Sequence, residues 1–189
     1  MIRTGTGAGM NHYIIVIYYI MISNFDIERI CRKLKLPIIG VFSKDKLPQK
    51  REIGSYYINL QDSNDGDGTH WTIAIIYSDD ERESETITTT GNGERVFRIG
   101  ALYFDPFGVD MPREVNEFLS PFKPIPYNNR QIQGLRQTEC GWYCIACDYS
   151  LHHKQHSDSY LEDFEKFIAL WSDRPTNNLK MLKALFRPL

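Results

Sequence analysis

Cys140 stands where a polar, turn-like stretch of the sequence changes into an apolar stretch with helical spacing. Trp142, Ile145 and Tyr149 follow it at steps of three and four residues, which predicts a helix that begins at Cys140. A sulfur in the first turn of a helix faces unpaired backbone N–H groups and the positive end of the helix dipole, and both favour a thiolate. Gly141 puts no side chain beside this sulfur, so that a substrate carbonyl could approach the Cys140 N–H as an oxyanion donor. The pattern is typical of a nucleophilic cysteine.

A nucleophilic cysteine needs a base, and the base needs a group that orients it. His70 opens a strand-like run at residues 71–77, and Asp105 directly follows a second strand-like run at residues 96–104. If the two runs pair as an antiparallel hairpin, the start of the first lies beside the end of the second. We therefore expect His70 and Asp105 to be neighbours at one end of a sheet.

The order of these residues along the chain resembles the His, acid, Gln, Cys order of the adenovirus-type and ULP1-like cysteine proteases. Within that group the sequence is most similar to the maturation proteases of virophages and polinton-like viruses, over residues 25–149. The motifs that carry the resemblance are His70-Trp71, the turn Asp105-Pro-Phe-Gly108, Gln133, and Cys140-Gly141. Each motif alone is common, but their order on suitable local structure is specific.

The resemblance implies a role for each of four residues. Cys140 would be the nucleophile, His70 the general base and acid, and Asp105 the group that orients the imidazole. Asp105 matches the ULP1 branch, whereas the adenovirus enzymes have Glu at this place. Gln133 would be a side-chain oxyanion donor, a role that suits an amide because it donates a hydrogen bond without carrying a charge.

Gln133 has two rivals in the same loop, Gln131 and Gln137. The gap of six residues between Gln133 and Cys140, together with the glycine at position 134, matches the adenovirus pattern. The ULP1 branch usually has a gap one residue shorter. Gln133 is the preferred oxyanion donor on this ground.

Three residues are predicted to contact the substrate: Trp71, Gly141 and Trp142. Trp71 next to the base suits a place in the core or a cleft wall equally well. With Trp142 behind the nucleophile, little room would remain at the scissile carbonyl, so a small residue such as Gly is expected there.

The function that the resemblance implies is a cysteine endopeptidase that cleaves viral structural (capsid) precursor proteins after small residues such as Gly during virion maturation. The expected partner is a capsid precursor, and the expected location is the virion and the interior of the infected host cell. One alternative is an isopeptidase for a ubiquitin-like modifier of the SUMO type. A second alternative is a non-catalytic protein-binding module on the same scaffold, against which the four intact residues of the motif weigh.

Composition narrows the possible partners. The net charge is −2, so no global basic field favours nucleic acid. The resemblance implies two possible activators, DNA and a cysteine-bearing peptide, and Cys31 is one conceivable site for a disulfide with that peptide. The sequence decides neither activator. Three of the four cysteines fall within eight residues, which is not the pattern of a secreted disulfide framework and favours a reducing compartment. No cofactor and no metal site are predicted, and Cys144 and Cys147 are expected to be small buried residues.

The chain divides into an N-terminal extension, residues 1–22, of uncertain role, and a single cysteine protease domain, residues 23–189. The apolar run at residues 13–22 is half of the roughly 20 residues that a membrane-spanning helix needs, so no membrane role is expected. The expected fold class is α+β, with a small antiparallel or mixed sheet flanked by helices and Cys140 at the N-terminus of a central helix. Residues 40–48 are expected to form a loop, and the resemblance implies that this loop frames the substrate cleft. Strands are predicted at 56–60, 71–77 and 96–104, and helices from Ser23 or Asn24 to Lys35, at 113–119, from 140, at 161–171 and at 178–186.

Overall fold

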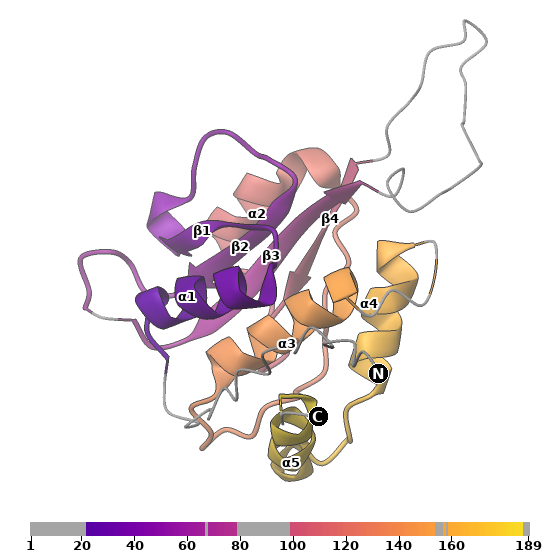
Figure 1. Ribbon diagram of the computed structural model, residues 1–189. Coiled ribbons are helices and arrows are strands. Elements are labelled where there is room, and N and C mark those ends of the chain that lie inside the picture. The colour runs from indigo at the N-terminus through magenta and orange to yellow at the C-terminus, as the bar shows by residue number, and fades with distance from the viewer. Residues whose placement is uncertain (1–21, 67, 79–98, 154–156, 158, 187–189) are drawn as a thin grey trace, which may run out of the picture.

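A four-stranded mixed β-sheet with helices on both faces forms the centre of the molecule (Figure 1). The structure is a computed structural model that describes residues 22–66, 68–78, 99–153, 157 and 159–186. The strands are β1 (Ile38–Ser43), β2 (Gly54–Asn59), β3 (Trp71–Ser78) and β4 (Ile99–Phe104), in the order β1-β2-β3-β4. Strand β1 is parallel to β2, and the other neighbours are antiparallel. The predicted α+β class is confirmed.

Strand β1 corrects the prediction of a loop at residues 40–48. Residues 38–43 are a strand, and the 3-10 turn η1 (Lys44–Lys46) follows it. The sequence does not predict this strand, because none of its six residues is fully buried and the run shows no polar–apolar alternation. Its backbone partner is the parallel strand β2, with Val41 paired to Tyr57.

The first described helix, α1 (Asn24–Leu34), begins where the sequence predicts. Ser23 is its N-cap and forms a capping box with Asp26: the Ser23 Oγ accepts from the Asp26 N, and the Ser23 N donates to Asp26 Oδ2, both at 3.2 Å. Lys35 closes the helix in a left-handed conformation, with φ +55°. Between these two caps, α1 contacts β1 at the edge of the sheet (Figure 1).

The two faces of the sheet pack against different helices. Alternate residues of the strands face opposite sides. Tyr57, Ile73 and Ile75 belong to the core that includes α1 and the central helix α3 (Cys140–His153). The opposite core contains side chains from α2 (Arg113–Leu119). The remaining elements are the 3-10 turn η3 (Ser120–Phe122) and the helices α4 (Tyr160–Ala169) and α5 (Pro175–Leu185), both of which contact α3.

A buried carboxylate ties the central helix to the sheet. Asp148 lies in the middle of α3 and is fully buried. Its two oxygens accept hydrogen bonds from the Ser55 Oγ at 2.7 Å and from the Tyr57 OH at 2.8 Å, both on β2. The His152 Nδ1 lies 2.9 Å from the same carboxylate. Because a buried carboxylate needs such partners, these contacts set the position of α3 along the sheet.

The described chain begins at Ile22, which is 7% exposed and belongs to the main core. The other residues of the predicted extension, 1–21, lie outside the described residues, as does most of the polar connection between β3 and β4, residues 79–98. The boundary between extension and domain therefore stays a prediction. Within the described part of the chain, no helix is both long and apolar enough to cross a membrane.

Candidate active site

The β3–β4 hairpin brings an imidazole and a carboxylate together. Strands β3 and β4 pair with Ile73 opposite Phe104, so the residues just outside this pair meet at one end of the sheet. The His70 Nε2 lies 2.8 Å from Asp105 Oδ1. The predicted proximity of the two side chains is therefore confirmed.

Asp105 is fully buried, and its surroundings leave it one orientation. Its Oδ1 also accepts from the Phe107 N at 2.7 Å. The side chain of Asn128 holds its backbone on both sides: the Asp105 N donates to Asn128 Oδ1 at 2.9 Å, and Asn128 Nδ2 donates to the Asp105 O at 2.6 Å. The Phe107 ring stacks on the His70 ring with centroids 4.6 Å apart. Sequence reasoning missed Phe107 and Asn128; only Phe107 had a signal, as part of the Asp-Pro-Phe-Gly turn.

Cys140 is the first residue of α3 and is 5% exposed. The backbone N–H of Trp71 donates a hydrogen bond to the Cys140 Sγ at 3.4 Å. The carbonyl of the same residue accepts from the Cys144 Sγ at 3.3 Å, one helical turn further on. The start of β3 is thus attached to the first two turns of α3, which places the sulfur beside the residue that follows His70.

The pKa of His70 is raised from 6.5 to about 9. Burial of the ring acts in the opposite direction, since it favours the neutral imidazole, but the hydrogen bond to Asp105 and the interaction with the Cys140 thiol outweigh it. Asp105 occupies Nε2, so Nδ1 is the nitrogen left for Cys140. Nδ1 is buried, and among the described residues it has no hydrogen-bond partner. A pKa of about 9 means that the imidazole is protonated near pH 7.

Gln133 is fully buried in the loop that precedes α3. Its Nε2 donates to the Gln137 backbone carbonyl at 2.6 Å, which leaves the second amide hydrogen free to donate elsewhere. Its rivals have other partners: Gln131 Nε2 donates to the Gln133 O at 2.8 Å, and Gln137 Oε1 accepts from the Gly134 N at 2.9 Å. The role of Gln133 as oxyanion donor stays a prediction.

The Gln133 loop is attached both to the Asp105 turn and to the C-terminal helices. The Gln133 N donates to the Pro106 O at 2.8 Å, next to Asp105. The Asn178 Nδ2, on α5, donates to the Ile132 O at 2.9 Å. The guanidinium of Arg130 donates to the carbonyls of Ile168 and Trp171 and lies 2.7 Å from Asp173 Oδ1. Asn178 and Arg130 were not singled out in the sequence, because nothing local marks them.

Gly141 has a packing role that the sequence did not suggest. A Cβ at this position would lie 2.7 Å from Ile22 Cδ1 and 3.3 Å from Trp71 Cδ1. The space beside Gly141 is therefore filled by Ile22 and the Trp71 ring. Trp142 is 3% exposed and packs on Phe186, with ring centroids 5.5 Å apart. Both residues belong to the protein core, and a substrate contact for either one stays a prediction.

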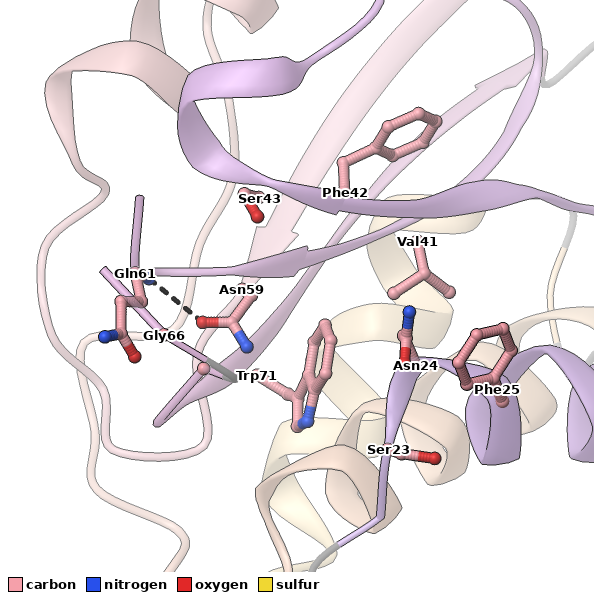
Figure 2. A pocket seen from close by; sticks show the side chains of 11 residues that line it. Ser23, Asn24, Phe25, Val41, Phe42, Ser43, Asn59, Gln61, Gly66 and Trp71 are labelled. Carbon is pink, nitrogen blue, oxygen red and sulfur yellow. Dashed lines mark hydrogen bonds between the residues drawn. The ribbon is translucent and has the colours of Figure 1, made fainter. Parts of the chain in front are cut away.

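Trp71 belongs both to the core and to a pocket of about 550 Å³ (Figure 2). Its ring is 7% exposed, and its Nε1 donates to the Ile22 O at 3.1 Å. The pocket is lined by residues from the start of α1, from β1, from the end of β2 and from the loop after it. These are Ser23, Asn24, Phe25, Val41, Phe42, Ser43, Asn59, Gln61, Gly66, Gly68 and Trp71.

The other three cysteines differ from Cys140 in their surroundings. Cys31, Cys144 and Cys147 are fully buried free thiols. Burial raises the pKa of Cys31 to about 12 and the pKa values of Cys144 and Cys147 well above their ordinary range. Such thiols are poor nucleophiles. Among the described residues no group of His, Cys, Asp and Glu is arranged to hold a metal ion.

The sequence matches no protein-family model and no curated protein. Among solved structures, the chain is similar to the crystal structure of the ASFV pS273R protease, with 15% identity and a TM-score of 0.42. The similarity covers 76% of this chain and 61% of that chain, so this protein spans about three fifths of the length of its neighbour.

Proposed function

We propose that the protein is a cysteine endopeptidase that hydrolyses peptide bonds through an acyl-enzyme. One observation carries the proposal: a buried Asp105–His70 pair, 2.8 Å apart, lies beside a cysteine at a helix N-terminus, whose sulfur contacts the N–H of Trp71, the residue that follows His70. A nucleophile, a base and an orienting carboxylate in this order are the parts that such chemistry needs.

The proposed reaction begins with the sulfur. Cys140 Sγ attacks the scissile carbonyl carbon, a C–S bond forms, and the carbonyl electron pair moves to oxygen. The Cys140 N–H and the Gln133 amide donate hydrogen bonds to this oxyanion. Collapse of the intermediate breaks the C–N bond, and His70 Nδ1 gives its proton to the leaving amine. The then neutral His70 takes a proton from a water molecule, whose oxygen attacks the thioester carbonyl. The C–S bond breaks, the acid product leaves, and the Cys140 thiolate and the His70 imidazolium that began the cycle are restored.

The proposed substrates are viral capsid precursor proteins, cut after a small residue such as Gly during virion maturation. This part rests on the resemblance of the sequence motifs to the virophage and polinton-like maturation proteases. The proposed place of action is the virion and the interior of the infected cell.

The test compares two substrates in parallel. The purified protein is incubated with the capsid precursor from its own locus and with a ubiquitin-like modifier precursor, and a Cys140→Ala protein serves as the control for both. Cleavage of the capsid precursor by the wild type alone is the expected result. Processing of the modifier with the capsid precursor left intact would establish the isopeptidase instead.

The non-catalytic alternative is tested by reactivity. Iodoacetamide near neutral pH should alkylate Cys140 well before the three buried cysteines, as seen by peptide mass spectrometry. A Cys140 that reacts no faster than Cys31, Cys144 and Cys147 would mean that the scaffold binds proteins without chemistry.

A further inference from the structure

The pocket beside Trp71 is linked to the candidate nucleophile by that residue, which lines the pocket and whose N–H contacts the Cys140 Sγ. None of its described lining residues carries a charge; they are aromatic, aliphatic, hydroxyl, amide and glycine residues. One rim is Phe25, whose side chain is 77% exposed. A lining of this kind suits a neutral polypeptide segment better than an ion.

The pocket lies on the acyl side of the scissile bond. In the proposed reaction His70 protonates the leaving amine, so the leaving half of the substrate lies next to the imidazole and to Phe107, which is stacked on it. Trp71, whose N–H contacts the Cys140 Sγ, lines the pocket, whereas His70, Phe107 and Asp105 are not among its described lining residues. The half of the substrate that becomes the acyl group therefore extends into the pocket.

The shape of the pocket suits an extended segment. Val41, Phe42 and Ser43 of β1 all line it, although successive side chains of a strand point to opposite faces. A pocket that meets three consecutive residues borders the edge of the strand. Among the described strands β1 is at the edge of the sheet, on the side away from β2. A substrate in extended conformation can align with such an edge.

Asn59 is the polar group in the pocket with the least freedom. It is 5% exposed and pairs in register with Trp71 across β2 and β3, so both side chains are on one face of the sheet beside Cys140. Its Oδ1 accepts from the Gln61 N at 2.9 Å, which fixes the orientation of the amide. Figure 2 shows the amide nitrogen turned to the side of Trp71.

The amide nitrogen of Asn59 is a hydrogen-bond donor without an acceptor among the described residues. Asn59 Nδ2 donates no hydrogen bond to any of them, and it is not one of the buried polar atoms, so this nitrogen is accessible from the pocket although the residue as a whole is 5% exposed. Gly68 leaves the amide its room: its φ is +90°, and a Cβ there would lie 1.7 Å from Asn59 Nδ2. A donor in a fixed orientation, at the wall of a pocket whose described lining residues are uncharged, fits a backbone carbonyl of a peptide.

We propose that Asn59 is a substrate-positioning residue whose side-chain amide donates a hydrogen bond to a backbone carbonyl of the extended segment on the acyl side of the scissile bond. This inference rests on the proposed peptidase function and goes beyond it. The hydrogen bond holds the segment along β1 and so directs the scissile carbonyl to Cys140.

The test uses a peptide aldehyde, acetyl-Ala-Ala-Ala-glycinal, and its thioamide versions, in each of which one carbonyl oxygen is replaced by the weaker acceptor sulfur. Binding is measured as protection of Cys140 from iodoacetamide, so no turnover is needed. In the wild type, one thioamide position should weaken binding about tenfold. Asn59→Leu should bind the parent aldehyde about tenfold more weakly and should be insensitive to that thioamide.

Two further variants guard against a folding defect. Asn59→Asp keeps the shape and the acceptor for the Gln61 N but removes the donor, so it should lose the same coupling. Asn116→Leu makes the same change at an exposed residue on α2, on the opposite face of the sheet, and should match the wild type. Each variant is compared by its rate of alkylation without peptide, which reports an intact Cys140 site.

The outcomes separate the two proposals. If the aldehyde does not protect wild-type Cys140 at all, the peptidase proposal fails, and this inference fails with it. If the aldehyde protects the wild type but neither Asn59 variant changes the response to any thioamide, the peptidase proposal stands and the role of Asn59 is overturned.

Discussion

The two halves of the candidate site are held by different kinds of contact. His70 and Asp105 lie at the end of a hairpin, and their proximity follows from the pairing of β3 with β4. Gln133 lies in a loop, and its position depends on side chains far along the chain, such as Asn178 on α5. The hairpin half is therefore set by local pairing, whereas the loop half is set by tertiary contacts.

The comparison predicts that the halves differ in how they fail. A hairpin gains its backbone hydrogen bonds within one supersecondary unit, so distant mutations should disturb it little. A loop that is held by a few buried polar groups should be more sensitive to mutation, because the loss of one partner leaves the other group without a hydrogen bond. Mutations in the C-terminal helices should therefore leave the geometry of His70 and Asp105 unchanged but should displace Gln133.

The largest effect is expected at the nucleophile and at the base of the hairpin half. Cys140→Ala and His70→Ala should each abolish hydrolysis of the capsid precursor, because neither member of the pair works alone. Asp105→Asn should retain measurable activity, since its role is orientation and charge support. The measurement is the rate of precursor cleavage. Undiminished cleavage by purified Cys140→Ala would refute the assignment of the nucleophile.

A smaller but still large effect is expected in the loop half. Gln133→Ala should lower kcat by about two to three orders of magnitude, as loss of one oxyanion donor does in other enzymes. KM should change little, since the hydrogen bond forms mainly in the transition state. Gln131→Ala is the matched control, because its amide already donates to the Gln133 O. A larger loss of kcat at Gln131 than at Gln133 would transfer the role to the rival.

The hairpin half should give the site a distinct pH dependence. Protonated His70 is the proton donor for the leaving amine, so kcat/KM should fall above a pH of about 9. Stability should follow the same group. The folded-state pKa lies above the unfolded value of 6.5, so the contribution is complete below pH 6.5 and is lost as pH rises through about 9.

Thermal unfolding between pH 6 and 10 and the pH profile of kcat/KM test this prediction. A His70→Ala protein should show no loss of stability that corresponds to this titration. If kcat/KM already falls as the pH rises from 6 to 7, His70 loses its proton near its ordinary pKa. Asp105 and Cys140 would then not raise the pKa of His70 as described.

Removal of the distant anchor of the loop half should have a moderate effect. Asn178→Ala leaves the Ile132 carbonyl without its donor and should lower the free energy of unfolding by about 1–3 kcal/mol. We expect kcat to fall more than in the matched control Asn177→Ala, an exposed neighbour on α5. Denaturant unfolding and kcat measure the two effects. Equal kcat values for the two variants would show that the C-terminal helices do not position Gln133.

The smallest effect is expected from deletion of residues 1–20. Ile22, which packs on Gly141 and Trp71, and the Ser23 cap of α1 are both retained. The truncated protein should therefore unfold cooperatively and cleave the precursor at a rate close to that of the full chain. Loss of the cooperative transition would show that part of the deleted run belongs to the core.

Local patterns predicted the parts of the molecule that local physics decides. Three features follow from residues that are close in sequence or from one hairpin. They are the cap at Ser23, the helix that begins at Cys140, and the proximity of His70 to Asp105. Each of these features forms its main hydrogen bonds within a single element or between adjacent ones. The sequence alone was therefore sufficient for them.

Other features depend on partners that no local pattern names. Strand β1 was missed because its partly buried residues show no polar–apolar alternation, and only its pairing with β2 identifies it as a strand. Ile22 packs closely against Gly141, and Asn178 holds the Gln133 loop; both contacts join segments that are distant in sequence. The partners of buried polar groups are determined when the helices pack on the sheet. Only then do these groups lose their water and form hydrogen bonds with whichever backbone atoms lie next to them.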